Sequence, residues 1–84
     1  MHKVSIKKSA FKEFKKIPLN IRENIKEVIY SLRENPLPVG CKKLKIYENC
    51  YRVRKGQYRV IYEIKGKDSI VVIKIGHRKY FITS

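Results

Sequence analysis

Acidic residues are scarce in this 84-residue chain, which has 7 Asp and Glu against 21 Lys and Arg and a formal net charge of +14. Such an imbalance opposes compaction unless a polyanion or an acidic partner offsets it. Nucleic acid, an anionic membrane and an acidic protein are therefore the candidate partners.

The chain also lacks the patterns of metalloproteins, membrane proteins and secreted proteins. Its cysteines, Cys41 and Cys50, form no CxxC motif and have no histidine at metal-ligand spacing, so we expect reduced thiols and no metal or other cofactor. No apolar run approaches the about 18 residues of a membrane span, and the N-terminus, Met-His-Lys-Val-Ser, has no signal-peptide core. We therefore expect a cytoplasmic protein.

Glycine and proline are also few, with 4 and 3 residues, while 43% of the residues are hydrophobic. This composition excludes a disordered tail. A chain of this length has room for one modest core, so residues 1–84 are expected to form a single domain.

Two segments have the apolar spacing of amphipathic helices. The first covers residues 8–16 and is stopped by Pro18, and the second covers residues 19–33 and is ended by Asn35-Pro36. Their apolar stripes are Phe11, Phe14 and Ile17 in the first segment and Ile21, Ile25, Val28, Ile29 and Leu32 in the second. Two helices joined by a few residues predict an αα-hairpin.

The remaining periodic segments predict four strands. Residues 2–6 alternate, residues 51–64 (YRVRKGQYRVIYEI) alternate on both sides of a turn at 55–57, and residues 69–75 form an apolar strand closed by Gly76. A strand that is apolar on both faces is expected at the centre of a sheet. The order β-α-α-β-β-β predicts an α+β fold, in which the two-helix hairpin packs on one face of a mostly antiparallel four-stranded sheet.

Alternation in the predicted β-hairpin places Arg52, Arg54 and Arg59 on one face. The opposite face, under the helices, receives Tyr51, Tyr58 and Tyr62. Because like charges side by side on a sheet repel, the clustered arginines predict an anionic ligand. A solvated strand face is the alternative interpretation.

Two further groups could bind an anionic ligand. Lys42, Lys43 and Lys45 follow the Pro-rich loop and could contact phosphates, although such a run is also typical of a solvated surface. In the tail after the last strand, Arg78 can reach back over the arginine-bearing face. Tyr80 or Phe81 could stack on a displaced base or belong to the core.

The element order, the hairpin YRVRKGQYRVIYEI and the residues Gly76-His77-Arg78 together resemble the RelE/ParE toxins of type II toxin-antitoxin systems. The resemblance covers nearly the whole chain. For the RelE branch it implies a ribosome-dependent, metal-independent mRNA endoribonuclease, and for the ParE branch an inhibitor of DNA gyrase without nuclease activity. A basic RNA-binding domain without catalysis is a third alternative.

RelE-type cleavage needs a deprotonated ribose 2′-OH, a neutralised phosphorane charge and a protonated 5′-oxygen, and it leaves a 2′,3′-cyclic phosphate and a 5′-OH. The resemblance implies that Arg52 and Arg54 occupy the two basic positions of the first hairpin strand. It further implies that Arg59 grips a phosphate and that Arg78 stabilises the transition state.

This sequence departs from the family pattern in its proton-transfer groups. Relatives carry lysine at the hairpin pair, whereas arginine stays charged with a pKa above about 12 and is a poor general base. His77, with an ordinary pKa of about 6.5, is therefore the candidate acid or base, and a structural hydrogen bond is its alternative role. Relatives also carry a tyrosine near the C-terminus, where Ile82 and Ser84 stand here.

A basic toxin of this kind is expected to be held by a cognate acidic, RelB-like antitoxin. An amphipathic helix of the antitoxin would lie in a groove of the toxin and mask the arginines. The other partners that the resemblance implies are the ribosomal A site and mRNA.

Overall fold

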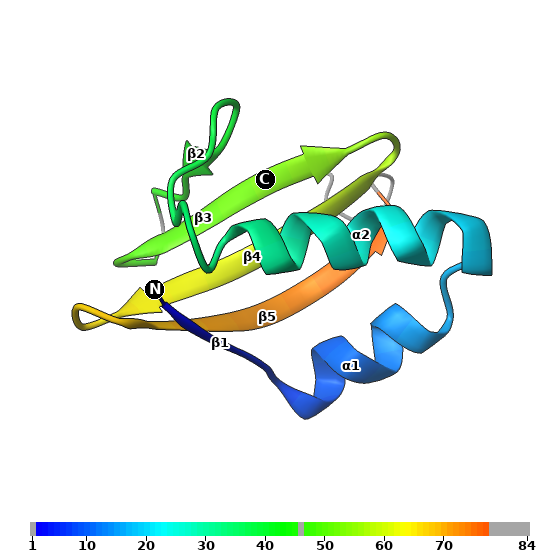
Figure 1. The fold of residues 1–84 in the computed structure, drawn as a ribbon, viewed down its shortest axis with the longest axis horizontal. Helices are drawn as coiled ribbons and strands as arrows, with labels where there is room; N and C mark the ends of the chain where they lie inside the picture. Colours follow the sequence, from blue (N-terminus) through cyan, green and yellow to red (C-terminus); the bar gives the residue numbers. More distant parts are fainter. Residues whose placement is uncertain (1, 46, 78–84) are drawn as a thin grey trace.

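The computed structural model describes residues 2–45 and 47–77 and shows two layers, with two helices over one face of a five-stranded sheet (Figure 1). The elements are β1 (Lys3–Ile6), α1 (Lys8–Lys15), α2 (Leu19–Ser31), β2 (Lys42–Lys43), β3 (Cys50–Lys55), β4 (Tyr58–Lys65) and β5 (Ser69–His77). The strand order is β1-β5-β4-β3-β2, with β1 parallel to β5 and the other neighbours antiparallel. The predicted α+β fold is confirmed.

The described sheet has one strand more than the four that the sequence predicts. Strand β2 pairs with Tyr51 and Arg52 at the edge of β3. Two lysines are too short a run to show alternation, so no pattern marked them as a strand. The loop before β2 contains Gly40, whose φ of 90° lies in the left-handed region that favours glycine.

Pro18 separates the two helices. Helix α1 ends at the cap residue Lys16, whose N–H donates to the carbonyl of Glu13, and the N–H of Ile17 donates to that of Phe14. Pro18 then stands at the N-cap of α2, and its carbonyl accepts hydrogen bonds from the N–H groups of Ile21 and Arg22. The proline that stops the first helix therefore also starts the second.

The core lies between the helices and the sheet. Fully buried side chains come from both layers, and they include Ala10, Ile25 and Leu32 from the helical side and Val60, Tyr62, Ile70, Val72 and Ile75 from the sheet. Each buried aliphatic side chain contributes about 1.5–3 kcal/mol relative to exposure, so this layer contact dominates the stability of the fold. The Tyr62 hydroxyl donates to the carbonyl of Pro36 at 2.7 Å, which fixes the chain where it leaves α2.

Helix α1 protects the part of the sheet edge that β1 does not cover. Strand β1 pairs with β5 only from Ser69 to Val72. Beyond that point Glu13 of α1 accepts hydrogen bonds from the backbone N–H of Ile75 at 3.1 Å and from Lys74 Nζ at 3.3 Å. An open strand edge invites pairing with another chain, and this carboxylate closes it.

A β-bulge interrupts the β4–β5 ladder. Ile61 is opposite Lys74 and Tyr62 is opposite Val72, so Ile73 is an extra residue on β5. As a result Ile70, Val72 and Ile75 all pack into the core although strict alternation would separate Ile75 from the other two. The bulge also determines which face the last residues of β5 occupy.

Candidate functional site

Three arginines share the sheet face that the helices leave uncovered. Arg54 is directly opposite Arg59, and Arg52 lies two residues along β3, opposite Ile61. Directly opposite residues of antiparallel strands project to the same face. The residues between them, Val53 and Val60, are buried in the core beneath the helices. The hairpin therefore presents its arginines away from the core, as its alternation predicts.

The strand register adds two lysines to this face. Lys42 of β2 is opposite Arg52, and Lys74 of β5 is opposite Ile61. One row across the sheet therefore consists of Lys42, Arg52, Ile61 and Lys74, and the next row of Arg54, Arg59 and Gly76. We call Lys42, Arg52, Arg54, Arg59 and Lys74 the basic face. Gly76 has no side chain and therefore adds none to the row beside Arg59.

Burial distinguishes the three arginines. Arg52 is only 9% exposed, Arg59 is half-buried and Arg54 is exposed. Arg52 has no hydrogen-bond or ion-pair partner among the described residues, where the ion pair present joins Lys74 to Glu13. A cation on a largely buried residue, without a counter-charge among the described residues, favours an anion bound beside it. Arg52 is therefore the strongest structural indication of an anion site.

The structure divides the lysine run. Lys42 lies on the basic face, whereas Lys43 is opposite Tyr51 and belongs to the other face. Lys45 is exposed in the loop after β2. Of the three lysines expected near phosphates, Lys42 is the one beside the arginines, and phosphate contacts by the other two stay predictions.

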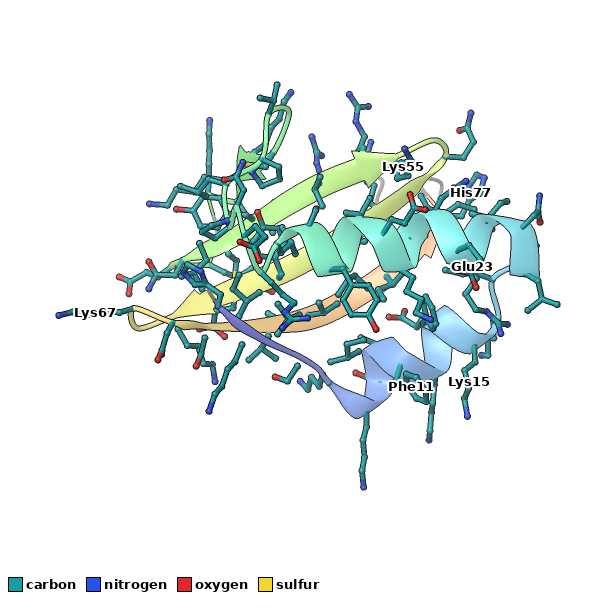
Figure 2. The ribbon with its side chains drawn as sticks, in the orientation of Figure 1. Phe11, Lys15, Glu23, Lys55, Lys67 and His77 are labelled. Carbon is teal, nitrogen blue, oxygen red and sulfur yellow. The ribbon has the colours of Figure 1, made fainter. Side chains whose placement is uncertain are left out.

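His77 lies on the opposite face from the arginines. Because of the bulge it is paired with Tyr58, and Gly76 takes the place opposite Arg59. With Lys55, Tyr58 and Asn24 it lines a small pocket of about 380 Å³ at the hairpin turn. Figure 2 shows Lys55 and His77 near α2. This position favours the structural role of His77 over proton transfer beside the arginines.

The remaining predicted site residues, Arg78, Tyr80 and Phe81, lie outside the described residues. Sequence analysis missed Lys74, which it counted within a continuous apolar strand. Lys74 is the charged residue inside the run 69–75, and this interruption is the signal that could have revealed it.

The titratable groups with shifted pKa values supply no base on the basic face. Burial, assisted by Glu63, raises the pKa of the Cys50 thiol and keeps it protonated near neutrality. Burial also raises the pKa of the Tyr62 hydroxyl, with contributions from Cys41 and Tyr51, and the rings of Tyr51 and Tyr62 stack 5.9 Å apart on the helix-covered side. The chemistry available on the basic face is therefore charge stabilisation by guanidinium and ammonium groups.

Among the described residues there is neither a candidate metal site nor a candidate membrane-spanning helix. No group of three or more His, Cys, Asp and Glu side chains among them is placed to hold a metal ion. In the same part of the chain, neither helix has the length and apolar character needed to cross a membrane.

The fold and the basic face together define a small α+β protein with a candidate site for an anionic ligand. Residues 4–80 match the model of the ParE toxin of type II toxin-antitoxin systems, parDE. A relative from Methanocaldococcus jannaschii, Toxin RelE3, is 38% identical over 81 residues, and the match covers 92% of this chain and 91% of the relative. The mRNA interferase toxin RelE of Escherichia coli is 30% identical over 73 residues, 83% of this chain and 76% of the relative.

A solved structure agrees with these sequence matches. The RelB-RelE antitoxin-toxin complex from Methanococcus jannaschii matches with a TM-score of 0.74 and 33% identity, over 92% of this chain and 93% of that one. The chain belongs to the RelE/ParE family of type II toxin-antitoxin toxins.

Proposed function

We propose that this protein is the toxin of a type II toxin-antitoxin pair and that it inhibits translation by cutting mRNA on the ribosome. The observation that carries the proposal is the nearly buried Arg52, which has no described partner and lies beside Arg54 and the half-buried Arg59. The mRNA interferase name of the E. coli relative supports the choice of RNA as the anion.

In the proposed reaction the ribose 2′-oxygen attacks the adjacent phosphorus while the bond from phosphorus to the 5′-oxygen breaks. The 2′-OH loses its proton and the 5′-oxygen gains one, which leaves a 2′,3′-cyclic phosphate and a 5′-OH. Negative charge develops on the phosphorane oxygens, and fixed guanidinium groups can neutralise it without a metal ion. Arg52, Arg54 and Arg59 take this role, with Arg78 as the fourth cation.

Arginines do not exchange protons near neutrality, so the basic face acts by charge and positioning. The ribosome, the substrate or solvent then supplies the proton transfers. Lys42 extends the phosphate track along the sheet, and Tyr80 or Phe81 are candidates for stacking on a displaced base.

The proposed partners are mRNA in the ribosomal A site and a cognate acidic antitoxin. The matching structure from Methanococcus jannaschii is a RelB-RelE antitoxin-toxin complex. A net charge of +14 fits an acidic partner of the same kind.

The test is a translating extract with a defined mRNA, whose ends are mapped by primer extension. The wild-type protein should cut only in the presence of ribosomes, and the products should carry cyclic phosphate and 5′-OH ends. Arg59→Ala should lose cutting, while Lys67→Ala, an exposed change in the β4–β5 turn, should retain it. Cutting of free mRNA at the same rate would contradict ribosome dependence.

The family model that matches is that of the ParE toxin, so gyrase inhibition is the second candidate. Purified gyrase and relaxed plasmid give the test, because a ParE-type toxin should stall supercoiling and leave mRNA intact. Binding to ribosomes without effect in either assay would indicate the third alternative, an RNA-binding domain without catalysis.

A further inference from the structure

The pocket at the hairpin turn combines an aromatic ring and two amide groups in one small hollow. It has a volume of about 380 Å³ and is open to solvent. Ile21 and Tyr58 line it with apolar surface, and Asn24 and Gln57 line it with carboxamide groups. This volume lies at the lower end of the range for small-molecule sites, about 300–1,000 Å³, so the pocket suits one small group and not a segment of polypeptide.

The two amides distinguish this pocket from the basic face. Asn24 and Gln57 are exposed, and neither has a hydrogen-bond partner within residues 2–45 and 47–77. Each carboxamide both donates and accepts hydrogen bonds, whereas guanidinium and ammonium groups only donate. The edge of a nucleotide base also presents donors and acceptors side by side, while an ionised phosphate oxygen only accepts. The chemistry of the pocket therefore matches a base better than a phosphate.

The strand register places this pocket beside the basic face. Lys55, Tyr58 and His77 form the row that follows Arg54 and Arg59 along the sheet. Neighbouring rows are about 3.3 Å apart along the strands and point their side chains to opposite faces. The hairpin turn follows directly after Lys55, whose side chain is exposed. An RNA strand with one phosphate on Arg54 and Arg59 can therefore pass around the end of the sheet, with Lys55 as a further cation for its backbone.

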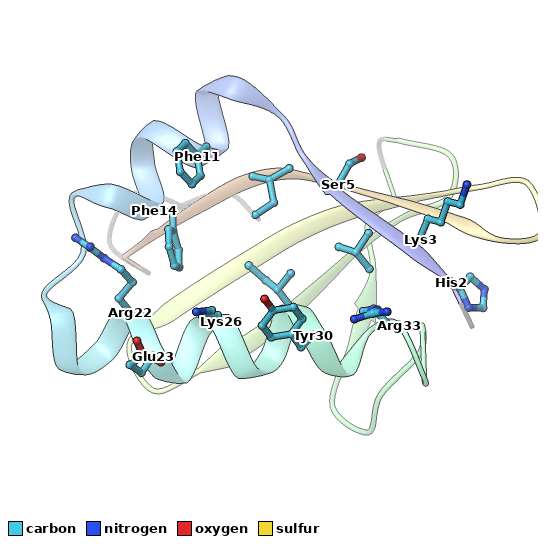
Figure 3. Close-up of a pocket in the computed structure, with 13 residues that line it drawn as sticks. His2, Lys3, Ser5, Phe11, Phe14, Arg22, Glu23, Lys26, Tyr30 and Arg33 are labelled. Carbon is cyan, nitrogen blue, oxygen red and sulfur yellow. The ribbon is translucent and has the colours of Figure 1, made fainter.

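A second aromatic surface is less suited to a base. It is a groove of about 1040 Å³ between α1, α2 and β1, and Phe11, Phe14 and Tyr30 are among the residues that line it (Figure 3). Arg22 Cζ lies 5.7 Å from the Phe14 ring centroid, and Lys26 Nζ lies 6.0 Å from that of Tyr30. A base would have to displace these cations in order to stack on the ring faces that they cover. The pocket at the hairpin turn is therefore the better match for a base.

We propose that the pocket at the hairpin turn receives one unstacked RNA base, while the phosphate of the same nucleotide is held by Arg54 and Arg59 on the basic face. Asn24 and Gln57 hydrogen-bond the edge of the base, and the base packs beside Tyr58. The proposal rests on the proposed function for the choice of RNA as the ligand. It gives the hairpin turn a role in reading bases, which phosphate contacts alone cannot do.

The test uses the full chain and labelled single-stranded RNA probes measured by fluorescence anisotropy. Two probes carry bases, an oligouridine and an oligoadenine, so that both a pyrimidine and a purine are offered to the pocket. The third is an abasic ribose-phosphate strand of the same length and charge. Asn24→Ala and Gln57→Ala change the pocket, and Asn20→Ala removes an exposed amide from α2 that does not line it.

The wild type should bind at least one base-carrying probe more tightly than the abasic strand. Asn24→Ala and Gln57→Ala should each weaken that probe about fivefold, the factor expected for one lost hydrogen bond, and leave the abasic strand within about twofold. Asn20→Ala should change neither. Arg54→Ala should weaken all three probes by the same factor, because their phosphates are identical. Melting curves confirm that each variant is folded.

The proposal is overturned if Asn24→Ala and Gln57→Ala leave the ratio of base-carrying to abasic affinity unchanged, or if Asn20→Ala lowers it as much as they do. Amide-dependent base binding in a protein that cuts no mRNA would refute the nuclease and leave the base pocket standing. Ribosome-dependent cutting by a protein whose amide variants bind every probe like the wild type would refute the pocket and leave the nuclease standing.

Discussion

His77 meets the ring of Tyr58 edge to face, with the ring centroids 5.4 Å apart and the ring planes at 78°. The contact joins the end of β5 to the start of β4 on the helix-covered side of the sheet. A histidine in this place holds the strand end from which the chain continues toward Arg78. The role that follows from this geometry is structural support for the site and not proton transfer within it.

His77→Gln should therefore lower the melting temperature and leave ribosome-dependent cutting within about threefold of the wild type, because the variant loses an aromatic pair worth about 0.5–1.5 kcal/mol. Single-turnover cutting between pH 5.5 and 8 checks this. A loss of about 10²- to 10⁴-fold in rate, together with loss of the pH dependence of that rate, would instead establish general acid–base catalysis.

Arg54→Ala should weaken RNA binding and make its salt dependence shallower. Each phosphate contact with a single strand contributes a slope of about −0.7 in log K against log salt, so one lost contact should remove about that amount. Titrations of oligouridine at several salt concentrations measure it. Lys65→Ala, an exposed change at the far end of β4, is the control, and an equal slope in both variants would remove Arg54 from the RNA site.

Arg52→Met should stabilise the fold while abolishing activity. Residue Arg52 is 9% exposed and has no counter-charge among the described residues, and replacing a largely buried charged side chain with an apolar one of similar volume should raise the free energy of unfolding by about 1–3 kcal/mol. Urea denaturation measures the change, with Arg54→Met as the exposed control, expected within about 0.5 kcal/mol of the wild type. Destabilisation by Arg52→Met would show that the buried charge is compensated within the protein.

Glu13→Ala should destabilise the protein by about 1–2 kcal/mol, because Ile75 loses the hydrogen-bond partner of its N–H at the sheet edge. The newly open edge should also increase association at high protein concentration, which light scattering detects. Glu27→Ala removes an exposed acid from α2 and should do neither. Equal behaviour of the two variants would mean that α1 protects the edge by packing alone.

Tyr62→Phe should make the free energy of unfolding fall less steeply as the pH rises above about 10. Burial raises the folded-state pKa of Tyr62 above its usual value of about 10, so its contribution is complete below pH 10 and is lost as the pH rises through the folded pKa. Near neutrality the variant should be less stable by about 1 kcal/mol, because the bond to the Pro36 carbonyl is missing. Denaturation at several pH values, with exposed Tyr47→Phe as the control, checks both effects.

The sequence predicted the arginine side of the site well, because the hairpin alternates without interruption from Tyr51 to Tyr62. The alternation of side chains along each strand determined which face of the sheet each residue occupies. The observed pairing of Arg54 with Arg59 agrees with that prediction. The faces of β5 could not be predicted in this way. Apolar residues lie on both faces of that strand, so its sequence gives no sign of the extra residue that forms the β-bulge. The bulge at Ile73 and the face of His77 were therefore outside what periodicity could predict.

Two other features depend on contacts between distant segments. Strand β2 exists because a loop returns two lysines to the edge of β3, and no local pattern encodes that pairing. The groove needs α1, α2 and β1 side by side, although its members, Phe11 among them, were visible as an apolar stripe. Such a stripe predicts a buried helix face, whereas the structure leaves Phe11 46% exposed.

The parallel pairing of β1 with β5 has a consequence for synthesis. Lys3 pairs with Ser69, so the first strand to leave the ribosome has no partner until the last strand has also emerged. Lys74 and Gly76 also join the basic face only at that moment, and such long-range pairing forms slowly. The basic face of the nascent chain is therefore incomplete until the last strand has been made.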